Sequence, residues 1–198
     1  MGNSVTLPAK IIQKNVDRGT SGKADFVVPY VICGDSRKVW RRAMFSEMRR
    51  KDRAMLEDET DALLKTAQVG TLATVSEDNT PYVVPMNFVY TKGVIYLHSA
   101  VEGKKLDNIV KNSSICFNVI DAVELMPAAF ATKYKSATVF GKIAIVEDPE
   151  EKRQGLIAVI QKYSPDFYES GLQYIDKAIE KTKVLRIEVS KITGKARV

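Results

Sequence analysis

Residues 69–99, which read VGTLATVSEDNTPYVVPMNFVYTKGVIYLHS, decide the fold class of this chain. The stretch contains three runs rich in β-branched and aromatic residues, at 69–76, 81–90 and 94–99. EDNT and TKG, which separate these runs, have compositions typical of turns. Short turns join strands that lie side by side and antiparallel, so the stretch predicts a three-stranded meander.

Two prolines stand inside the second of these strands. Pro81 and Pro85 have no backbone N–H group and cannot donate to a strand ladder. We therefore expect an edge or a bulge here, where backbone is left free to contact something else.

The rest of the chain predicts a β-barrel with helices at its ends. The acidic first turn and apolar stripe of 57–68 indicate a helix, and Gly141 predicts a bend in a long strand. Counted together, six mostly antiparallel strands favour a small closed barrel of the mainly β class. The further predicted elements are a short helix at 103–112, a strand at 113–123, a loop at 124–132, a strand at 135–148, helices at 149–164 and 165–182, and a strand at 183–196.

Charge divides the chain into two parts. Residues 1–53 hold 12 Lys and Arg against 5 Asp and Glu, whereas residues 54–198 hold 18 against 19. We interpret 1–44 as a basic N-terminal extension and 45–198 as the folded domain. The dense run at 37–53 could contact nucleic acid, but a solvated arm or a segment packed on a partner subunit is the favoured interpretation.

Composition predicts a cytoplasmic protein without a membrane span. No apolar run approaches the roughly 20 residues that cross a bilayer, and no secretory signal opens the sequence. Cys33 and Cys116 are far apart and neither belongs to a CxxC pair, which suits a reducing compartment. With one histidine and two isolated cysteines, we expect no metal site of the zinc type.

Catalytic motifs that rely on the protein's own side chains are missing. The sequence has no GxGxxG after a strand, no GxxxxGK[ST] and no GxSxG. His98 is the only histidine, and no serine context supports a triad around it. A catalyst of this composition would take its chemistry from a cofactor and supply binding and orientation.

The segment HSAVEGKKLDNI, residues 98–109, has the features of a phosphate site. A helix start offers free N–H groups, and Gly103 lets the backbone come close to a ligand. Lys104 or Lys105 would supply positive charge, and Ser99 a hydroxyl donor. The alternative is a solvated lysine pair at the start of a surface helix.

His98 itself has two interpretations. A histidine at a strand end is often a structural residue with its hydrogen bonds satisfied within the protein. It could instead face a ligand, because its pKa lies near neutrality and it can donate a hydrogen bond or bind a metal.

Four segments together resemble a known family. MRRKDRAM (48–55), VGTLATVSEDNTPYVVPMNFVY (69–90), GVIYLHSAVEGKKLDNI (93–109) and ICFNV (115–119) are similar to the nitroimidazole-resistance (Nim) branch of the pyridoxamine 5′-phosphate oxidase-like, FMN-binding split-barrel superfamily. The resemblance covers about residues 45–198 and leaves the first 44 residues unexplained. It agrees with the barrel predicted from the strand pattern.

The resemblance implies a homodimer that holds FMN in clefts between two barrels, with FAD possible. His98 would lie beside the flavin and the substrate pocket, as the candidate catalytic residue. The resemblance places Pro85, Met86 and Asn87 along the flavin ring. It places Ser99, Lys104 and Lys105 at the phosphate, with Ala100 also among the cofactor-binding residues. Ser136 and Thr138 would reach the flavin from the partner subunit.

The activity implied is that of a flavin-dependent oxidoreductase. Electrons would come from a reduced nicotinamide or a redox protein and pass to a small acceptor such as a nitroaromatic. No arginine-rich pyridoxamine-phosphate site is apparent, so that oxidase activity is not expected. The alternatives are a haem-binding split barrel with His98 as iron ligand, and a flavin-binding protein without turnover.

Overall fold

The structure is a computed structural model that describes residues 47–91 and 93–198. The extension predicted at 1–44, and most of the basic run at 37–53, lie outside the described residues. All elements below belong to the domain that begins after them.

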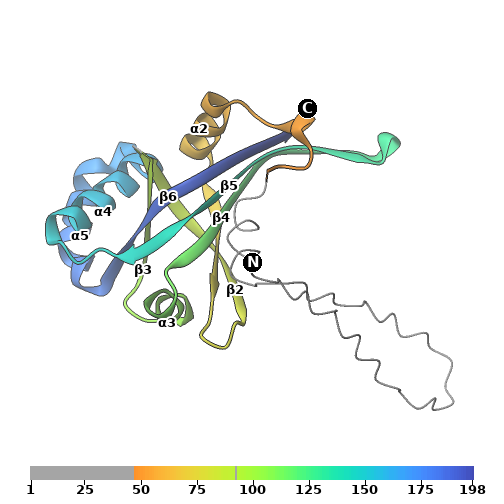
Figure 1. The fold of residues 1–198 in the computed structure, drawn as a ribbon. Helices are drawn as coiled ribbons and strands as arrows, with labels where there is room; N and C mark the ends of the chain where they lie inside the picture. The colour runs from red at the N-terminus through yellow and green to blue at the C-terminus, as the bar shows by residue number, and fades with distance from the viewer. Residues whose placement is uncertain (1–46, 92) are drawn as a thin grey trace, which may run out of the picture. The chain divides into compact units, whose positions relative to one another are not determined.

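Six antiparallel strands close into a barrel in the order β1-β2-β3-β6-β5-β4 (Figure 1). The meander β1-β2-β3 is formed as predicted, and the mainly β class and the closed barrel are confirmed. A register shift between Phe140 and Gly141 marks the bend expected in the long strand. The strands are β1 Val69–Val75, β2 Pro81–Thr91, β3 Val94–Ala100, β4 Ser114–Met126, β5 Ala131–Ile145 and β6 Thr182–Arg197.

Helices flank the barrel where the sequence predicts them. The first, α2, carries three acidic residues in its first turn, and α4 begins with Pro149. The Asp148 side chain caps α4 by accepting a hydrogen bond from the Glu151 amide at 2.7 Å. The helices are α2 Glu57–Thr66, α3 Lys104–Lys111, α4 Pro149–Tyr163 and α5 Tyr168–Ala178, with short 3₁₀ turns η1 Lys51–Arg53, η2 Pro127–Ala129, η3 Pro165–Phe167 and η4 Ile179–Lys181.

The loop predicted at 124–132 is wrong. Here β4 continues to Met126 and β5 begins at Ala131, so the two strands form a hairpin arm that projects from the barrel (Figure 1). Pairing resumes beyond a bulge that follows Asp121, and the chain turns over Pro127–Ala129 and Phe130, which has a left-handed backbone conformation. Proline and small residues define the tip of this hairpin, and their composition hides the short paired segments on either side.

The main core fills the barrel around an aromatic pair. Phe88 of β2 and Phe117 of β4 are fully buried, and their rings meet edge to face with centroids 5.0 Å apart. This geometry is favourable for aromatic rings beyond simple burial. Gly70 of β1 lies under the Phe117 ring, where an added Cβ would stand 2.1 Å from the ring carbon Cζ. Glycine at position 70 is therefore required by packing.

The end of α4 ties down the backbone of Phe88. Tyr163 Oη accepts a hydrogen bond from the Phe88 amide at 2.9 Å and donates to the Gln68 carbonyl at 2.6 Å. Lys162 Nζ donates to the carbonyls of Ala67 and Phe88 at 2.7 and 2.9 Å and lies 4.0 Å from the centroid of the Phe88 ring. We refer to Lys162 and Tyr163 as the α4 clamp. Burial lowers the pKa of Lys162 to about 8, so most of the ammonium is still charged at pH 7.

Replacing Gly70 by Ala should lower the free energy of unfolding by about 1–3 kcal/mol, because the new methyl group collides with the Phe117 ring. Urea denaturation at pH 7 measures the loss. Shortening the ring in the double variant Gly70→Ala/Phe117→Leu should give a penalty smaller than the sum of the two single changes. An unchanged midpoint for Gly70→Ala alone would contradict the packing described.

Replacing Lys162 by Met should lower the free energy of unfolding by about 1–3 kcal/mol, because the carbonyls of Ala67 and Phe88 each lose one charged donor at a half-buried position. Lys65→Met is the matched control, since Lys65 is exposed and its ion pair with Asp61 contributes little at the surface. The urea unfolding midpoints of the two variants, compared with that of the unchanged protein, test this expectation. Equal small losses would mean that the α4 clamp does not stabilise Phe88.

Candidate functional site

The barrel is split between β2 and β3. Their pairing runs only from Phe88 opposite Leu97 to Thr91 opposite Val94. Residues 81–87 of β2 pair with β1 alone, and residues 98–100 of β3 pair with β6 alone. The two segments therefore leave each other and expose two unpaired edges. Had the register continued, the facing pairs would have been Asn87 with His98, Met86 with Ser99 and Pro85 with Ala100.

The direction of the backbone N–H and C=O groups explains why β2 tolerates a proline at position 85. The amide and carbonyl of Phe88 face Tyr163, which also bonds Gln68 just before β1. Backbone groups alternate sides along a strand, so the nitrogen of Pro85 faces the open edge. A missing N–H costs no ladder hydrogen bond there, as expected for a strand edge.

Side chains of the two edges divide between the barrel interior and its outer surface. Met86 and Ser99 are buried, and the Ser99 hydroxyl donates to the Ala100 carbonyl at 2.9 Å. Pro85 and Asn87 are exposed on the outside, where the Asn87 amide donates to the Gln68 carbonyl at 3.3 Å. The outer side of the split is thus the side open to a ligand.

The first turn of α3 adjoins the β3 edge. Gly103 stands before it with φ 134°, a conformation that favours glycine, and it has no side chain with which to cap the helix. Its carbonyl accepts from the Leu106 amide at 2.8 Å. Lys104 is exposed and Lys105 is half-buried. Backbone N–H groups, a helix N-terminus and two ammonium groups form a donor set suited to a phosphate.

Asn108 holds α3 against the barrel, and sequence reasoning missed it. This buried amide donates from Nδ2 to the Thr74 hydroxyl at 2.9 Å and accepts from the Ser76 hydroxyl at 3.0 Å. The available signal was an amide between Leu106 and Ile109 on the apolar face of the helix. Because Asn108 lies one turn after Lys104, its hydrogen bonds fix the position of the phosphate-type first turn.

His98 points away from the barrel interior. Leu97 and Ser99 on either side are buried inside, so alternation turns His98 towards α4 and α5. It lines a pocket of about 180 Å³ together with Leu156, Ile160, Tyr174, Ile175 and Ala178, among others. Part of the ring stays exposed, yet burial by its neighbours lowers the pKa of His98 below the ordinary 6.5. The imidazole is therefore mainly neutral at pH 7.

Ser136 and Thr138 do not join the other predicted residues within one chain. They lie on β5, which β4 and β1 separate from β2 in the barrel. The Thr138 hydroxyl accepts from Asn118 Nδ2 at 2.9 Å, and the Ser136 hydroxyl donates to the Lys195 carbonyl at 3.3 Å. Their contact with a cofactor would need a second subunit.

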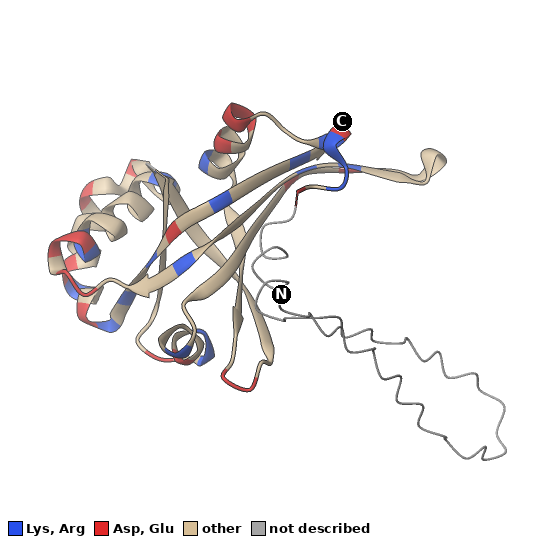
Figure 2. Ribbon diagram, in the orientation of Figure 1, with Lys and Arg blue, Asp and Glu red and all other residues tan. Residues whose placement is uncertain are grey.

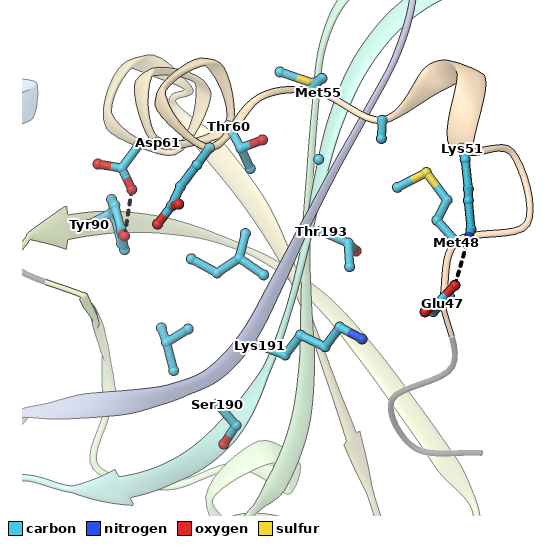
Figure 3. Close-up of a pocket in the computed structure, with 15 residues that line it drawn as sticks. Glu47, Met48, Lys51, Met55, Thr60, Asp61, Tyr90, Ser190, Lys191 and Thr193 are labelled. Atoms are coloured by element: carbon cyan, nitrogen blue, oxygen red, sulfur yellow. Dashed lines mark hydrogen bonds and ion pairs between the residues drawn. The ribbon is translucent and has the colours of Figure 1, made fainter. Parts of the chain in front are cut away.

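A larger hollow of about 660 Å³ lies elsewhere, between α2 and the end of β6 (Figure 3). Tyr90 donates to Asp61 at 2.7 Å there, and burial together with this bond raises the pKa of Tyr90 to about 12. The same bond holds the pKa of Asp61 below its usual value. Neither group exchanges protons near pH 7, and none of the predicted site residues lines this hollow.

In the part of the chain that the structure describes, no group of three or more His, Cys, Asp or Glu side chains is placed to hold a metal ion. Within residues 47–91 and 93–198, no helix combines the length and apolarity needed to cross a bilayer. Burial raises the pKa of the Cys116 thiol, which disfavours a reactive thiolate.

Residues 57–196 match a family model described as pyridoxamine 5′-phosphate oxidase. The chain belongs to this family. The match spans the barrel, from α2 almost to the end of β6. It supports the resemblance noted from the sequence motifs, whereas a search of curated proteins gave no match.

Solved structures show the same fold. A proposed 5-nitroimidazole antibiotic resistance protein from Bacteroides thetaiotaomicron is 29% identical, with a TM-score of 0.64 over 72% of this chain and 86% of that one. The flavocytochrome Anf3 of Azotobacter vinelandii is 20% identical, with a TM-score of 0.67 over 77% and 72%. A FAD- and haem-binding protein of Mycobacterium smegmatis is 20% identical, with a TM-score of 0.64 over 74% and 73%. A solved protein described as a nitroimidazole resistance protein is thus similar to this chain, in agreement with the branch indicated by the sequence motifs.

The pKa of His98 should lie below the value near 6.5 of an unfolded chain, because its surroundings disfavour the charged ring. Between the two pKa values the unfolded chain binds more protons, so this histidine makes stability rise with pH across that interval. As the only histidine, it gives one set of imidazole NMR signals to titrate, with the urea-unfolded chain as reference. A folded value at or above the reference would contradict the burial described.

Proposed function

We propose that this protein is an FMN-binding oxidoreductase that reduces a small acceptor. The observation that carries the proposal is the split between β2 and β3, with an uncapped, lysine-bearing helix start beside it. The unpaired end of β3 is followed along the chain by a phosphate-type donor set. These are the elements that a flavin mononucleotide needs for its ring and its phosphate.

The phosphate would bind at the start of α3. Lys104 and Lys105 supply charge, and the first amides of the helix supply donors. Ser99 stands at the end of β3, close in sequence to this turn, and Ala100 belongs to the same open edge. The bonds of Asn108 keep the turn in place before any ligand arrives, which lowers the ordering cost of binding.

The flavin ring would lie along the open edge of β2. Pro85, Met86 and Asn87 are unpaired towards β3, and the α4 clamp holds Phe88 where the edge begins. Clamping preserves the gap, because it fixes Phe88, the first residue of β2 that pairs with β3. A bound flavin supplies the redox chemistry, and this chain supplies position and surroundings.

A homodimer would complete the site. The outer face of β1 and β2 is apolar and uncharged: Val69 and Val83 are 50% and 57% exposed, Ile120 of β4 is 59% exposed, and no charged residue occurs in β1 or β2. Figure 2 shows charged residues concentrated away from these strands. Such a face can pack against its copy without like-charge repulsion. Ser136 and Thr138 of a second subunit could then approach the flavin.

The acceptor is proposed as a nitroaromatic or a similar small molecule, with a reduced nicotinamide or a redox protein as donor. The Bacteroides relative named for nitroimidazole resistance supports this choice. His98, beside the β3 edge, is the proposed catalytic residue. As a mainly neutral imidazole it could donate or accept one hydrogen bond at the acceptor. No arginine-rich site supports pyridoxamine phosphate as the substrate.

Flavin is favoured over haem. The pocket that His98 lines holds about 180 Å³, below the 300–1,000 Å³ typical of drug-sized ligands and too small for a haem. The visible spectrum of the purified protein separates the two cofactors. Two broad flavin bands support the proposal, and a single intense Soret band would replace it with the haem alternative.

Replacing both Lys104 and Lys105 by Ala should weaken FMN binding at least tenfold. Each charge-assisted hydrogen bond contributes about 1.5–3 kcal/mol, and 1.4 kcal/mol equals a factor of ten in affinity. Fluorescence titration of the flavin-free protein with FMN measures this loss. Lys111→Ala at the other end of α3 is the matched control and should bind FMN normally. Unchanged affinity in the double variant would refute the phosphate site.

A further inference from the structure

The hairpin arm, which comprises residues 122–133, leaves the barrel as a ribbon of two strands (Figure 1). Its pairs run from Glu124 opposite Lys133 to Met126 opposite Ala131. In the described part of the chain no third strand adjoins these pairs, because β6 reaches only to a position opposite Tyr134. A ribbon of two strands is at best marginally stable in water, so a surface that covers the arm would stabilise it.

The arm has an apolar side and a polar side. Leu125 stands opposite Thr132, and Val123 precedes Leu125 by two residues, so these side chains share one side. Glu124 and Lys133 face each other on the other side, where they form an ion pair at 3.7 Å. Val123 and Leu125 are 60% and 72% exposed. The apolar side of the arm is therefore largely uncovered.

The tip of the arm is also apolar. No charged residue occurs between Glu124 and Lys133, and the tip carries no charge colour in Figure 2. Phe130 is 98% exposed and has φ 48°, a left-handed conformation that is costly for a bulky residue. Contact with another molecule would bury this ring and offset that cost.

The alternation of β5 indicates which molecule that is. Ala137 and Val139 are buried inside the barrel, so Ser136 and Thr138 lie on its outer face. Thr132 is four residues before Ser136 in the same strand and therefore belongs to the same face. The apolar side of the arm thus continues the face that Ser136 and Thr138 would present to the flavin of a second subunit.

The arm is also continuous with the uncharged face that the proposed homodimer uses. Ile120, which stands opposite Ser136, is 59% exposed and leads along β4 into Val123 and Leu125. From Lys135 to Phe130 the strand advances five residues at about 3.4 Å each, or roughly 17 Å. This length carries the arm well beyond the two residues that would approach the flavin.

We propose that the hairpin arm binds a second copy of this chain, with Val123, Leu125 and Phe130 against that copy beside its split. The side of the partner that the arm reaches rests on the proposed function, since it follows from the flavin contacts of Ser136 and Thr138. A twofold axis makes the contact reciprocal, so each subunit both gives an arm and receives one. The polar side, with Glu124 and Lys133, stays in water.

Analytical ultracentrifugation of the full chain measures the dimer dissociation constant. Leu125→Gln and Phe130→Asn should each raise this constant at least tenfold, because a dimer contains each change twice. Asn suits the left-handed conformation at position 130, so the turn is kept. Glu124→Gln, on the opposite side of the arm, and Leu56→Gln, at an equally exposed leucine before α2, are the matched controls and should dimerise normally.

A monomer at every concentration would overturn the proposal, as would unchanged dimer constants in both arm variants. Circular dichroism and thermal melting identify a variant that fails to fold, and the other arm variant then decides. Loss of binding to phosphatidylserine vesicles, with the dimer constant unchanged, would assign the arm to a lipid surface and overturn the proposal as well.

FMN titration of the same variants separates this outcome from that of the flavin proposal. If the arm variants weaken the dimer and the unchanged protein does not bind FMN, the arm contact stands and the flavin function fails. If the unchanged protein binds FMN and the arm variants dimerise normally, only the arm contact fails.

Discussion

The hydrogen bonds that hold the backbone of Phe88 are the constraint on which the site depends. Phe88 packs its ring on Phe117 in the centre of the barrel, while Tyr163 and Lys162 bind its amide and carbonyl. Both ends of this residue are thus fixed, one by the core and the other by α4. Because β2 begins to pair with β3 at this position, the same contacts determine where the barrel stays open.

An open barrel wall leaves backbone groups without strand partners. In a barrel whose neighbouring strands pair along their whole length, such groups would all be used by those strands. Here the unpaired end of β3 leads along the chain into the first turn of α3, whose position Asn108 fixes through Thr74 and Ser76. The candidate site therefore consists mainly of main-chain groups and lysines. This composition suits binding of a phosphate-bearing cofactor better than acid–base chemistry by side chains.

The two faces of β3 have different surroundings, one in the barrel core and the other against the helices. Ile95, Leu97 and Ser99 face the barrel interior, whereas Tyr96 and His98 face the helices. Tyr96 donates to Glu151 at 2.9 Å and helps to attach α4. His98, two residues further along, has no such bond and borders a pocket. Alternation along one strand thus places a structural residue and a ligand-facing residue side by side on the same face.

The sequence alone determined the strand order of the meander, the barrel class and most of the helices, because these depend on local periodicity and turn residues. Pro85 marked the strand edge, and Gly103 with its two lysines marked the helix start, since their chemistry is local as well. Only the tertiary structure decided the hairpin arm, the α4 clamp, the Asn108 anchor and the pocket at His98. The hairpin arm pairs residues close in the chain, such as Met126 with Ala131, across a turn whose composition reads as a loop. The α4 clamp, the Asn108 anchor and the pocket depend on residues far apart in the chain, as with the 32 residues between Ser76 and Asn108 and the 95 between Gln68 and Tyr163. No pattern of neighbouring residues records a contact of that kind, because it forms only when the barrel closes.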